Sequence, residues 1–252
     1  MSLFLTHKKT YRKSLLGFLL IFSFAIQGFD INSFDSKNAF KLGAELMALP
    51  YGMHRIEPIE QSIETVVIGV HGSNSEGYEW VYPLWRLNNQ SKAIYFFRWD
   101  DQECPNQRSD TLLKAIEKIV YLYKDVQSIQ IMAHSYGGLY LLHALDLIEE
   151  FSNKNNLKLK VEIHFIASLL SPPKMLQVRC SLNKPSQKYK DLKIFNWKTI
   201  QALDGAFRTY KEDPQELSII DSRQTRLPET YNGKKLGHNW SISWVADQLA
   251  NK

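Results

Sequence analysis

Cysteine and metal-ligand patterns are nearly absent from this chain of 252 residues. It contains two cysteines, Cys104 and Cys180, with no CxxC pair and no Cys/His spacing of the kind that binds zinc. Two cysteines are too few for a small scaffold held together by disulfides, and a 44% share of hydrophobic residues is instead typical of a globular protein. We therefore expect no bound metal.

The sequence also lacks nucleotide-binding and lipidation motifs and any basic stripe. Neither a GxGxxG pattern nor a P-loop is present, so no cofactor is expected. The formal net charge is +5, but Lys8, Lys9, Arg12 and Lys13 lie in residues 1–25, which hold no acidic residue. The rest of the chain therefore carries a net charge of only +1, which argues against a nucleic-acid partner.

One apolar run stands out, at residues 15–26 (LLGFLLIFSFAI), directly after that basic cluster. Its twelve residues suit a signal peptide, whereas a membrane-spanning helix needs about 20. Ser23 and Ala25 are small enough for cleavage after Ala25, so we expect a signal peptide at residues 1–25 and a single domain at residues 26–252. The alternative is an uncleaved anchor, with membrane association through residues 8–26. In both cases the body of the chain is expected to be exported, either periplasmic or secreted.

From about residue 62 onward, segments with strand character alternate with segments with helix character. The expected strands are residues 64–71, 93–99, 128–133, a part of 159–170, 192–200 and 217–220. The expected helices are residues 39–49, 78–87, one capped by Ser109 and Asp110, 139–151, and one from about residue 241 to the C-terminus. This alternation predicts an α/β fold with a doubly wound, mostly parallel sheet that is covered on both faces.

The strongest local motif is AHSYGG at residues 133–138, between a predicted strand and a predicted helix. A small-x-Ser-x-Gly pentapeptide at such a junction is typical of a nucleophile elbow, in which a sharp turn exposes the serine hydroxyl. Ser135 is therefore the candidate nucleophile, with Ala133 in place of the usual first glycine. The alternative is a turn whose serine only caps the helix.

Together with VHG at residues 70–72 and GHNW at residues 237–240, this motif makes the chain resemble the α/β-hydrolase superfamily. It is most similar to lipase-like members with an AHSxGG elbow. The resemblance covers most of residues 64–245 and implies the α/β-hydrolase fold. Because residues 173–190 form only a short insert, we expect a small or absent lid.

The resemblance also implies roles for residues near these motifs. The backbone N–H groups of Ser73 and Tyr136 are the expected oxyanion-hole donors, since a tetrahedral intermediate develops negative charge on its oxygen. His238 stands last in the family's chain order of nucleophile, acid and histidine, so it is the expected general base. Four further residues are expected in supporting roles: His71, Gly72, His134 and Gly137.

The acid that orients the histidine follows a strand after the nucleophile's helix in this family. The tip at residues 171–173 holds no carboxylate, whereas Asp204-Gly205 follows the strand predicted at residues 192–200 and looks like the family's acid turn. Asp204 is therefore the expected acid, and Asp221 is the alternative. For either aspartate, a solvated turn residue is the competing interpretation.

Two features of the strand-end loops stay open. Cys104 and Cys180 follow different strands, so they either form a disulfide at the rim of the site or remain free thiols. The family's strand order places two other strands between them, which disfavours the disulfide. Asp100 and Asp101 are expected to pair with Arg98 or Arg108 rather than to contact substrate.

These residues predict a serine hydrolase that cleaves a carboxylic ester through an acyl-enzyme, as an esterase or a small lipase. The expected partner is a small-molecule or lipid ester, with no nucleic acid, and the oligomeric state is left open. The same triad also serves acyltransferases and thioesterases, and a catalytically silent binding protein with this fold is a further alternative.

Overall fold

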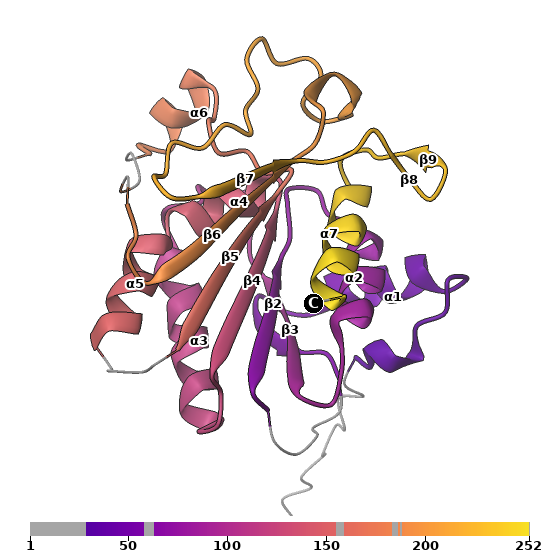
Figure 1. The fold of residues 1–252 in the computed structure, drawn as a ribbon, viewed down its shortest axis with the longest axis vertical. Helices are drawn as coiled ribbons and strands as arrows, with labels where there is room; N and C mark the ends of the chain where they lie inside the picture. Colours follow the sequence, from indigo (N-terminus) through magenta and orange to yellow (C-terminus); the bar gives the residue numbers. More distant parts are fainter. Residues whose placement is uncertain (1–28, 58–62, 155–158, 183–185, 187, 252) are drawn as a thin grey trace, which may run out of the picture.

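The computed structural model describes residues 29–57, 63–154, 159–182, 186 and 188–251 and arranges them around one central sheet (Figure 1). The predicted signal peptide lies outside these residues. Every helix within the described ranges is too short or too polar to span a bilayer.

The central sheet has the strand order β1-β3-β2-β4-β5-β6-β7. The edge strand β1 (Gly52–Arg55) pairs antiparallel with β3 (Lys92–Arg98), and all other neighbours in the sheet are parallel. The other strands are β2 (Thr65–Val70), β4 (Ser128–His134), β5 (Lys160–Ile166), β6 (Leu192–Lys198) and β7 (Arg223–Arg226). Parallel strands end at a common edge of the sheet, so the loops after β2, β3, β4, β5 and β6 meet there. The predicted mostly parallel sheet is confirmed.

Helices cover both faces of the sheet (Figure 1). On one face lie α3 (Ser109–Leu122), α4 (Tyr136–Leu142) and α5 (Leu145–Lys154). On the other lie α1 (Ala39–Ala48), α2 (Tyr78–Leu87) and α7 (Trp240–Ala250). The remaining elements are the short helices η1 (Ile31–Ser33), η2 (Gln201–Leu203) and α6 (Lys174–Arg179), and the hairpin strands β8 (Thr230–Tyr231) and β9 (Lys234–Lys235).

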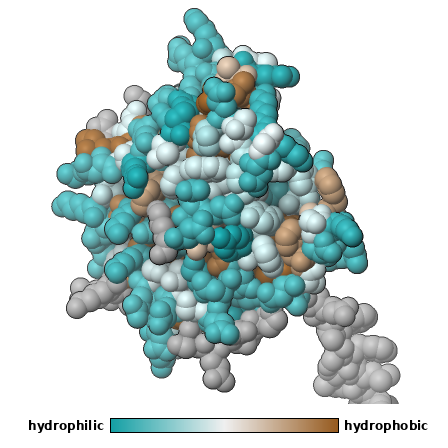
Figure 2. Space-filling view, turned by 45° about the vertical axis from the view of Figure 1, so that its right-hand side comes forward, coloured by the Kyte–Doolittle hydropathy of each residue, from teal (hydrophilic) through white to brown (hydrophobic). Residues whose placement is uncertain are grey.

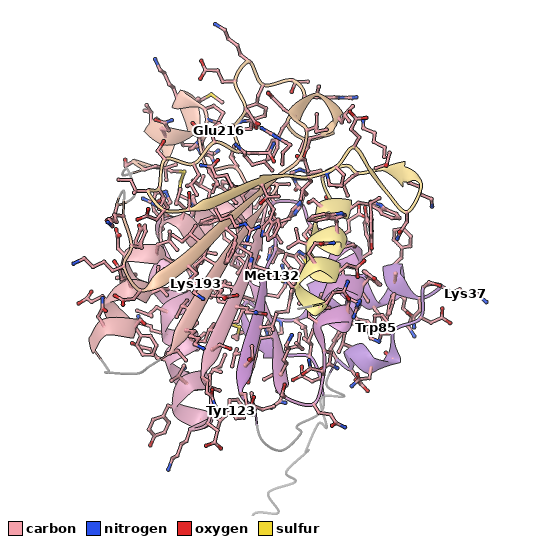
Figure 3. All side chains as sticks on the ribbon, viewed as in Figure 1. Lys37, Trp85, Tyr123, Met132, Lys193 and Glu216 are labelled. Atoms are coloured by element: carbon pink, nitrogen blue, oxygen red, sulfur yellow. A yellow bond between two sulfur atoms is a disulfide. The ribbon has the colours of Figure 1, made fainter. Side chains whose placement is uncertain are left out.

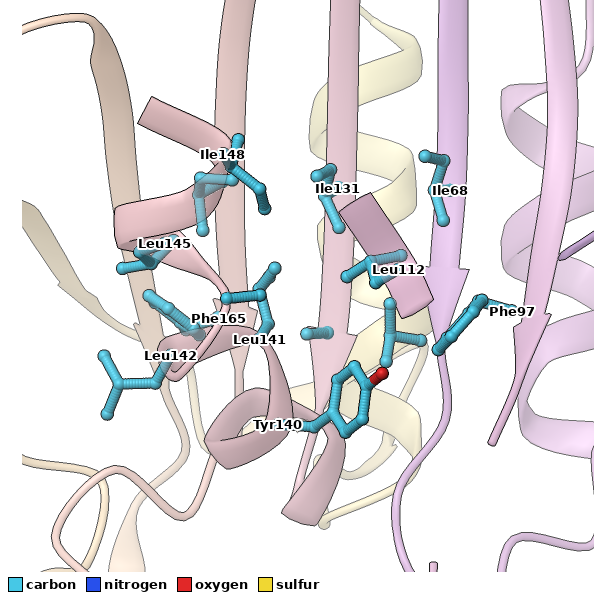
Figure 4. Packing of buried hydrophobic residues seen from close by; sticks show 14 of the residues in the cluster. Ile68, Phe97, Leu112, Ile131, Tyr140, Leu141, Leu142, Leu145, Ile148 and Phe165 are labelled. Carbon is cyan, nitrogen blue, oxygen red and sulfur yellow. The ribbon is translucent and has the colours of Figure 1, made fainter. Parts of the chain in front are cut away.

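The period of two along each strand divides the core into two layers. On β4, Ile129, Ile131 and Ala133 point to the layer shared with α3, α4 and α5, while Met132 points to the layer shared with α1, α2 and α7. Figure 4 shows the first layer around Ile131, and Figure 3 shows Met132 among the strands at the centre of the molecule. Because both faces are covered, β2 has a nearly continuous apolar sequence, TVVIGV.

Three sequence predictions about elements were wrong. Residues 217–220 form no strand: Leu217 and Ile219 are buried in the core from a loop, and the polar edge strand β7 follows instead. The helix predicted at residues 139–151 is two helices, α4 and α5, because Ala144 N–H bonds to Leu141 O three residues back and tightens the chain. Ser109 lies inside α3, whose N-cap is Arg108.

The two cysteines form a disulfide, with their Cα atoms 5.3 Å apart. Cys104 lies in the loop after β3, and Cys180 directly follows α6 in the segment after β5. The strand order confirms that β2 and β4 lie between β3 and β5, so the bridge spans the ends of two strands. The argument from strand order against a disulfide was therefore wrong, because these two loops are long enough to meet above the sheet.

The surface seen in Figure 2 is mostly hydrophilic, with hydrophobic residues in small separate patches. Figure 3 likewise shows Lys37 projecting outward at the periphery of the molecule. Scattered apolar residues of this kind are normal on protein surfaces.

Truncation of Ile131 to alanine is expected to lower the free energy of unfolding by about 2–5 kcal/mol, because a fully buried side chain leaves a cavity. Ile220→Ala is the matched control, since Ile220 is 53% exposed, and it should change this free energy by no more than about 0.5 kcal/mol. Urea unfolding monitored by circular dichroism measures both values. Equal effects of the two variants would contradict the assignment of Ile131 to the core.

Candidate active site

Ser135 occupies the sharp turn between β4 and α4. Its φ of 54° and ψ of −124° are dihedrals that residues with a side chain rarely adopt, at a cost of about 1–3 kcal/mol. The neighbouring segment holds the turn: Ser135 N–H donates to Ile166 O over 3.2 Å, and Leu169 N–H donates to Ser135 O over 3.0 Å. This strained turn is the geometry that the AHSYGG motif predicts.

Two glycines let the surrounding loops approach this turn. A Cβ on Gly72 would lie 2.8 Å from the Cβ of Ser135, and a Cβ on Gly137 would lie 2.3 Å from His71 O. Real Cβ atoms do not approach other atoms this closely. Glycine at both positions therefore brings the loop after β2 into contact with the serine turn.

His238 precedes α7 and is bonded to Asp204. Its Nδ1 lies 2.9 Å from Asp204 Oδ2, and the two side chains are 14% and 0% exposed. Phe207 packs edge-on against the imidazole, with ring centroids 4.8 Å apart. The structure thus brings together the histidine and the aspartate that the sequence pairs.

Asp204 accepts several hydrogen bonds in its buried position. The Thr199 hydroxyl donates to Oδ2 over 2.5 Å, and the N–H groups of Ala206 and Phe207 donate to Oδ1 over 2.9 and 3.2 Å. Burial alone would raise the pKa of Asp204, but the hydrogen bonds from His238 and Thr199 outweigh it and lower the pKa below its usual value. The carboxylate is therefore ionised and can orient an imidazole N–H.

His134, at the end of β4, supports His238 from behind. The two rings are 4.4 Å apart, and His134 Nε2 lies 3.2 Å from His238 O. Burial, together with the proximity of His238, holds the pKa of His134 well below its usual value, so the ring is neutral. Since a carbonyl only accepts, Nε2 must carry the proton and donate it. His134 therefore positions the backbone of His238.

His71, at the end of β2, fixes the loop that follows it. Burial lowers the pKa of His71 to about 4, so this ring is also neutral. Nε2 accepts from Trp99 N–H over 3.2 Å, which leaves the proton on Nδ1 for donation to Gly72 O over 2.8 Å. The Gly72–Ser73 peptide group, which carries the Ser73 N–H, is thereby held in one orientation.

Of the two predicted oxyanion donors, Ser73 lines a pocket with Ser135, and Tyr136 directly follows Ser135 in the chain. The N–H of Tyr136 opens α4 and so has no acceptor within the helix. Ser135 and His238 line a pocket of about 100 Å³ together with residues of the loop after β2. The other residues that line it are Gly72, Ser73, Asn74, Ser75, Glu76, Tyr78, Glu79, His134 and Asn239. Ser135 Oγ forms no hydrogen bond to any described residue.

Asp221 lies away from this pocket. Its carboxylate is 71% exposed and lies 3.7 Å from Lys188 Nζ, so the choice of Asp204 over Asp221 agrees with the observed contact to His238. Asp100 and Asp101 form no close ion pair with an arginine among the described residues: Arg108 pairs with Glu103 over 2.8 Å, and Asp101 accepts from a backbone N–H. Burial lowers the pKa of the Arg98 guanidinium, but both aspartates still act on it by charge, since each tends to raise that pKa. Within the described ranges no group of three or more histidine, cysteine or acidic residues is suited to a metal ion.

Sequence reasoning missed the residues that surround Asp204. Gln215 is fully buried, and its Oε1 accepts from Thr199 N–H over 2.8 Å, which fixes the residue that donates to Asp204. Gln215 comes from an irregular loop, and no motif marks such a residue. Only the position of Thr199, next to the strand that leads to the acid, offers a signal.

Comparisons with known proteins agree on the fold. No family model and no curated protein matches this chain. Est1E from Butyrivibrio proteoclasticus is similar in structure, with a TM-score of 0.54, 12% identity, and coverage of 79% of this chain and 90% of Est1E. A structure of Est1E with ferulic acid bound matches with a TM-score of 0.52. A protein from Silicibacter sp. tm1040 assigned as a thioesterase has a TM-score of 0.54 and 14% identity, over 85% of this chain and 89% of its own. The chain has the α/β-hydrolase fold.

The neutral, buried state of His71 is expected to make stability depend on pH. The unfolded chain protonates this ring below about pH 6.5, whereas the folded chain does so only below about pH 4. The free energy of unfolding therefore falls by about 3 kcal/mol as the pH is lowered through this window. Urea unfolding between pH 7 and 4 should show this loss in the wild type and a smaller one in His71→Asn, whose amide keeps a donor toward Gly72 O. Identical pH slopes in the two proteins would contradict the assignment.

Proposed function

We propose that the protein is a serine hydrolase that cleaves a carboxylic ester, with Ser135 as nucleophile, His238 as general base and Asp204 as the acid that orients it. The observation that carries this proposal is the buried hydrogen bond between Asp204 and His238. This bond orients the imidazole, which lines the same pocket as Ser135. The strained turn at Ser135 and the α/β-hydrolase fold support the same assignment.

In this mechanism the ionised Asp204 accepts a hydrogen bond from the Nδ1–H of His238, and this tautomer leaves Nε2 free to take the proton of Ser135 Oγ. The hydroxyl oxygen attacks the acyl carbonyl, and the N–H groups of Ser73 and Tyr136 stabilise the resulting oxyanion. His238 then gives the proton to the leaving alcohol, and an acyl-enzyme remains. Water, deprotonated by His238, attacks this ester and releases the acid. The contact between Ser135 and His238 forms when substrate fills the pocket, as catalytic hydrogen bonds tighten in the complex.

The small segment over the site suggests an accessible active site, as in an esterase or small lipase. Between β5 and β6 the described residues contain only the six-residue helix α6, so a large lid does not restrict access. This supports an esterase or small lipase. A thioester is the second candidate, since the same triad serves both leaving groups and one structural neighbour is assigned as a thioesterase.

The disulfide supports the expected location outside the cytoplasm. Disulfides persist in oxidising compartments, and the Cys104–Cys180 bridge therefore agrees with export directed by residues 1–25. N-terminal sequencing of the mature protein tests whether it begins at Met1 or after Ala25.

Replacement of Ser135 by alanine is expected to lower ester hydrolysis by about 10⁴-fold or more, because no other group replaces the nucleophile. Hydrolysis of p-nitrophenyl esters from acetate to palmitate by residues 26–252 measures this effect, and the chain-length profile separates an esterase from a lipase. A fluorophosphonate probe should label the wild type and not Ser135→Ala. Labelling without ester turnover would favour a thioester or another acyl donor. The absence of both labelling and turnover would overturn the proposal.

Asp204→Asn is expected to lower kcat by about 10³- to 10⁴-fold, because an amide at this position no longer favours the tautomer that leaves Nε2 free. Asp221→Asn makes the same change in an exposed turn, and it should alter kcat by no more than about threefold. Steady-state kinetics of both variants measure the difference. An equal loss in both, or a loss only in Asp221→Asn, would contradict Asp204 as the acid.

A further inference from the structure

The loop between β3 and α3 contacts both segments that carry the proposed oxyanion donors. The first contact is made by Asp101, whose Oδ2 accepts the N–H of Asn74 over 2.5 Å. Asn74 has a φ of 52°, in the left-handed region, and directly follows Ser73. His71 holds the peptide group before Ser73 through Gly72 O, so Asp101 holds the peptide group after it. The peptide groups on both sides of Ser73 are thus held in place.

The second contact involves Tyr136, the residue of the other donor. Its hydroxyl donates to Glu103 O over 3.4 Å, and its ring lies 5.4 Å from that of Trp99, which ends the preceding strand. Trp99 also donates from Nε1 to His71 O over 2.9 Å. Residues 99–103 therefore contact the polypeptide on both sides of the proposed oxyanion hole.

The disulfide anchors this loop at its next residue, Cys104. The bridge joins it to Cys180 behind α6, and Asn106 Nδ2 donates to Cys180 O over 3.0 Å. An ion pair between Arg108 and Glu103 closes the same loop over 2.8 Å. The part of the loop that contacts Asn74 and Tyr136 is therefore tied to the segment after β5 as well as to β3.

We propose that residues 99–104 are a clamp that sets the oxyanion hole, with Asp101 as a positioning residue for the Ser73 N–H and with the Cys104–Cys180 disulfide as the anchor of the clamp. The inference rests on the proposed function. The inference goes beyond that function, because it states that kcat depends on a carboxylate and a disulfide that do not touch the reacting atoms. A dithiol that reduces the bridge breaks the S–S bond, forms two protein thiols and is itself oxidised to a disulfide.

Asp101→Leu removes the acceptor for Asn74 N–H at a similar side-chain size. It should lower kcat by about 10- to 100-fold, less than complete loss of an oxyanion donor, with little change in KM. Asp101→Asn keeps an acceptor oxygen and should restore kcat to within about threefold of the wild type. Asp125→Leu is the matched control outside the clamp, since Asp125 is exposed in a turn after α3, and it should retain kcat.

The role of the anchor is tested by reduction of the folded protein with dithiothreitol and, separately, by Cys104→Ser/Cys180→Ser. Each should lower kcat in the same direction as Asp101→Leu. If both act through one clamp, Asp101→Leu in the reduced protein should lower kcat by less than its effect in the oxidised protein, as a double-mutant cycle reveals. Additive effects, or unchanged kcat after confirmed reduction, would overturn the anchoring role.

Hydrogen exchange of the Asn74 amide tests the clamp without any catalytic assay. Exchange should accelerate in Asp101→Leu and after reduction, and it should stay slow in Asp101→Asn and Asp125→Leu. Unchanged Asn74 exchange in Asp101→Leu together with a lowered kcat would overturn the clamp. Faster exchange in Asp101→Leu, combined with a wild type that neither hydrolyses esters nor reacts with fluorophosphonate, would retain the clamp and overturn the proposed function. A loss of thermal stability alone, with kcat unchanged, would reduce Asp101 to a structural residue.

Discussion

The hydrogen bond between Asp204 and His238 is the interaction on which the site depends. It joins a loop after β6 to the segment before α7, and the Asp204 side chain is fully buried, so water does not compete for the carboxylate. A buried carboxylate is stable only when its oxygens are bonded. Thr199, Ala206 and Phe207 donate to Asp204 and meet this requirement, while Gln215 fixes Thr199. Asp204 can therefore remain ionised in its buried position only because these polar groups surround it.

Two buried histidines, His71 and His134, hold the backbone of the site in place and are unsuited to transfer protons. Desolvation lowers the pKa of each, so each ring has one donor and one acceptor nitrogen at neutral pH. His71 uses them to join Gly72 O to Trp99 N–H, and His134 uses its donor on His238 O. A positively charged ring would lack the acceptor, so the same burial that excludes these residues from catalysis makes them useful as supports.

Much of the fold and the order of the site residues could be predicted from the sequence. Ser135, Asp204 and His238 follow strands or precede a helix in an alternating pattern, and parallel strands bring such positions to one edge. The hydrogen bonds between loops could not be predicted in this way. Asp101 bonds to Asn74, and Gln215 bonds to Thr199, but no sequence pattern marks residues that meet only in the folded chain. The error at residues 217–220 has a similar origin: Leu217 and Ile219 are apolar because a loop buries them, whereas edge strand β7 pairs through its backbone and needs few apolar residues.

The disulfide shows how strand order and loop contacts combine. Since β2 and β4 lie between β3 and β5, a bridge from the loop after β3 to the segment after β5 must pass the ends of the two strands that precede Ser73 and Ser135. The two β-strand ends are rigid, because both strands pair on both sides within the sheet. The loop residues that follow them are not fixed by the sheet, and Asn74 and Tyr136 obtain their second contacts from residues 101 and 103. A disulfide that crosses the ends of β2 and β4 therefore restrains the loop residues after these strands, which backbone pairing in the sheet does not hold.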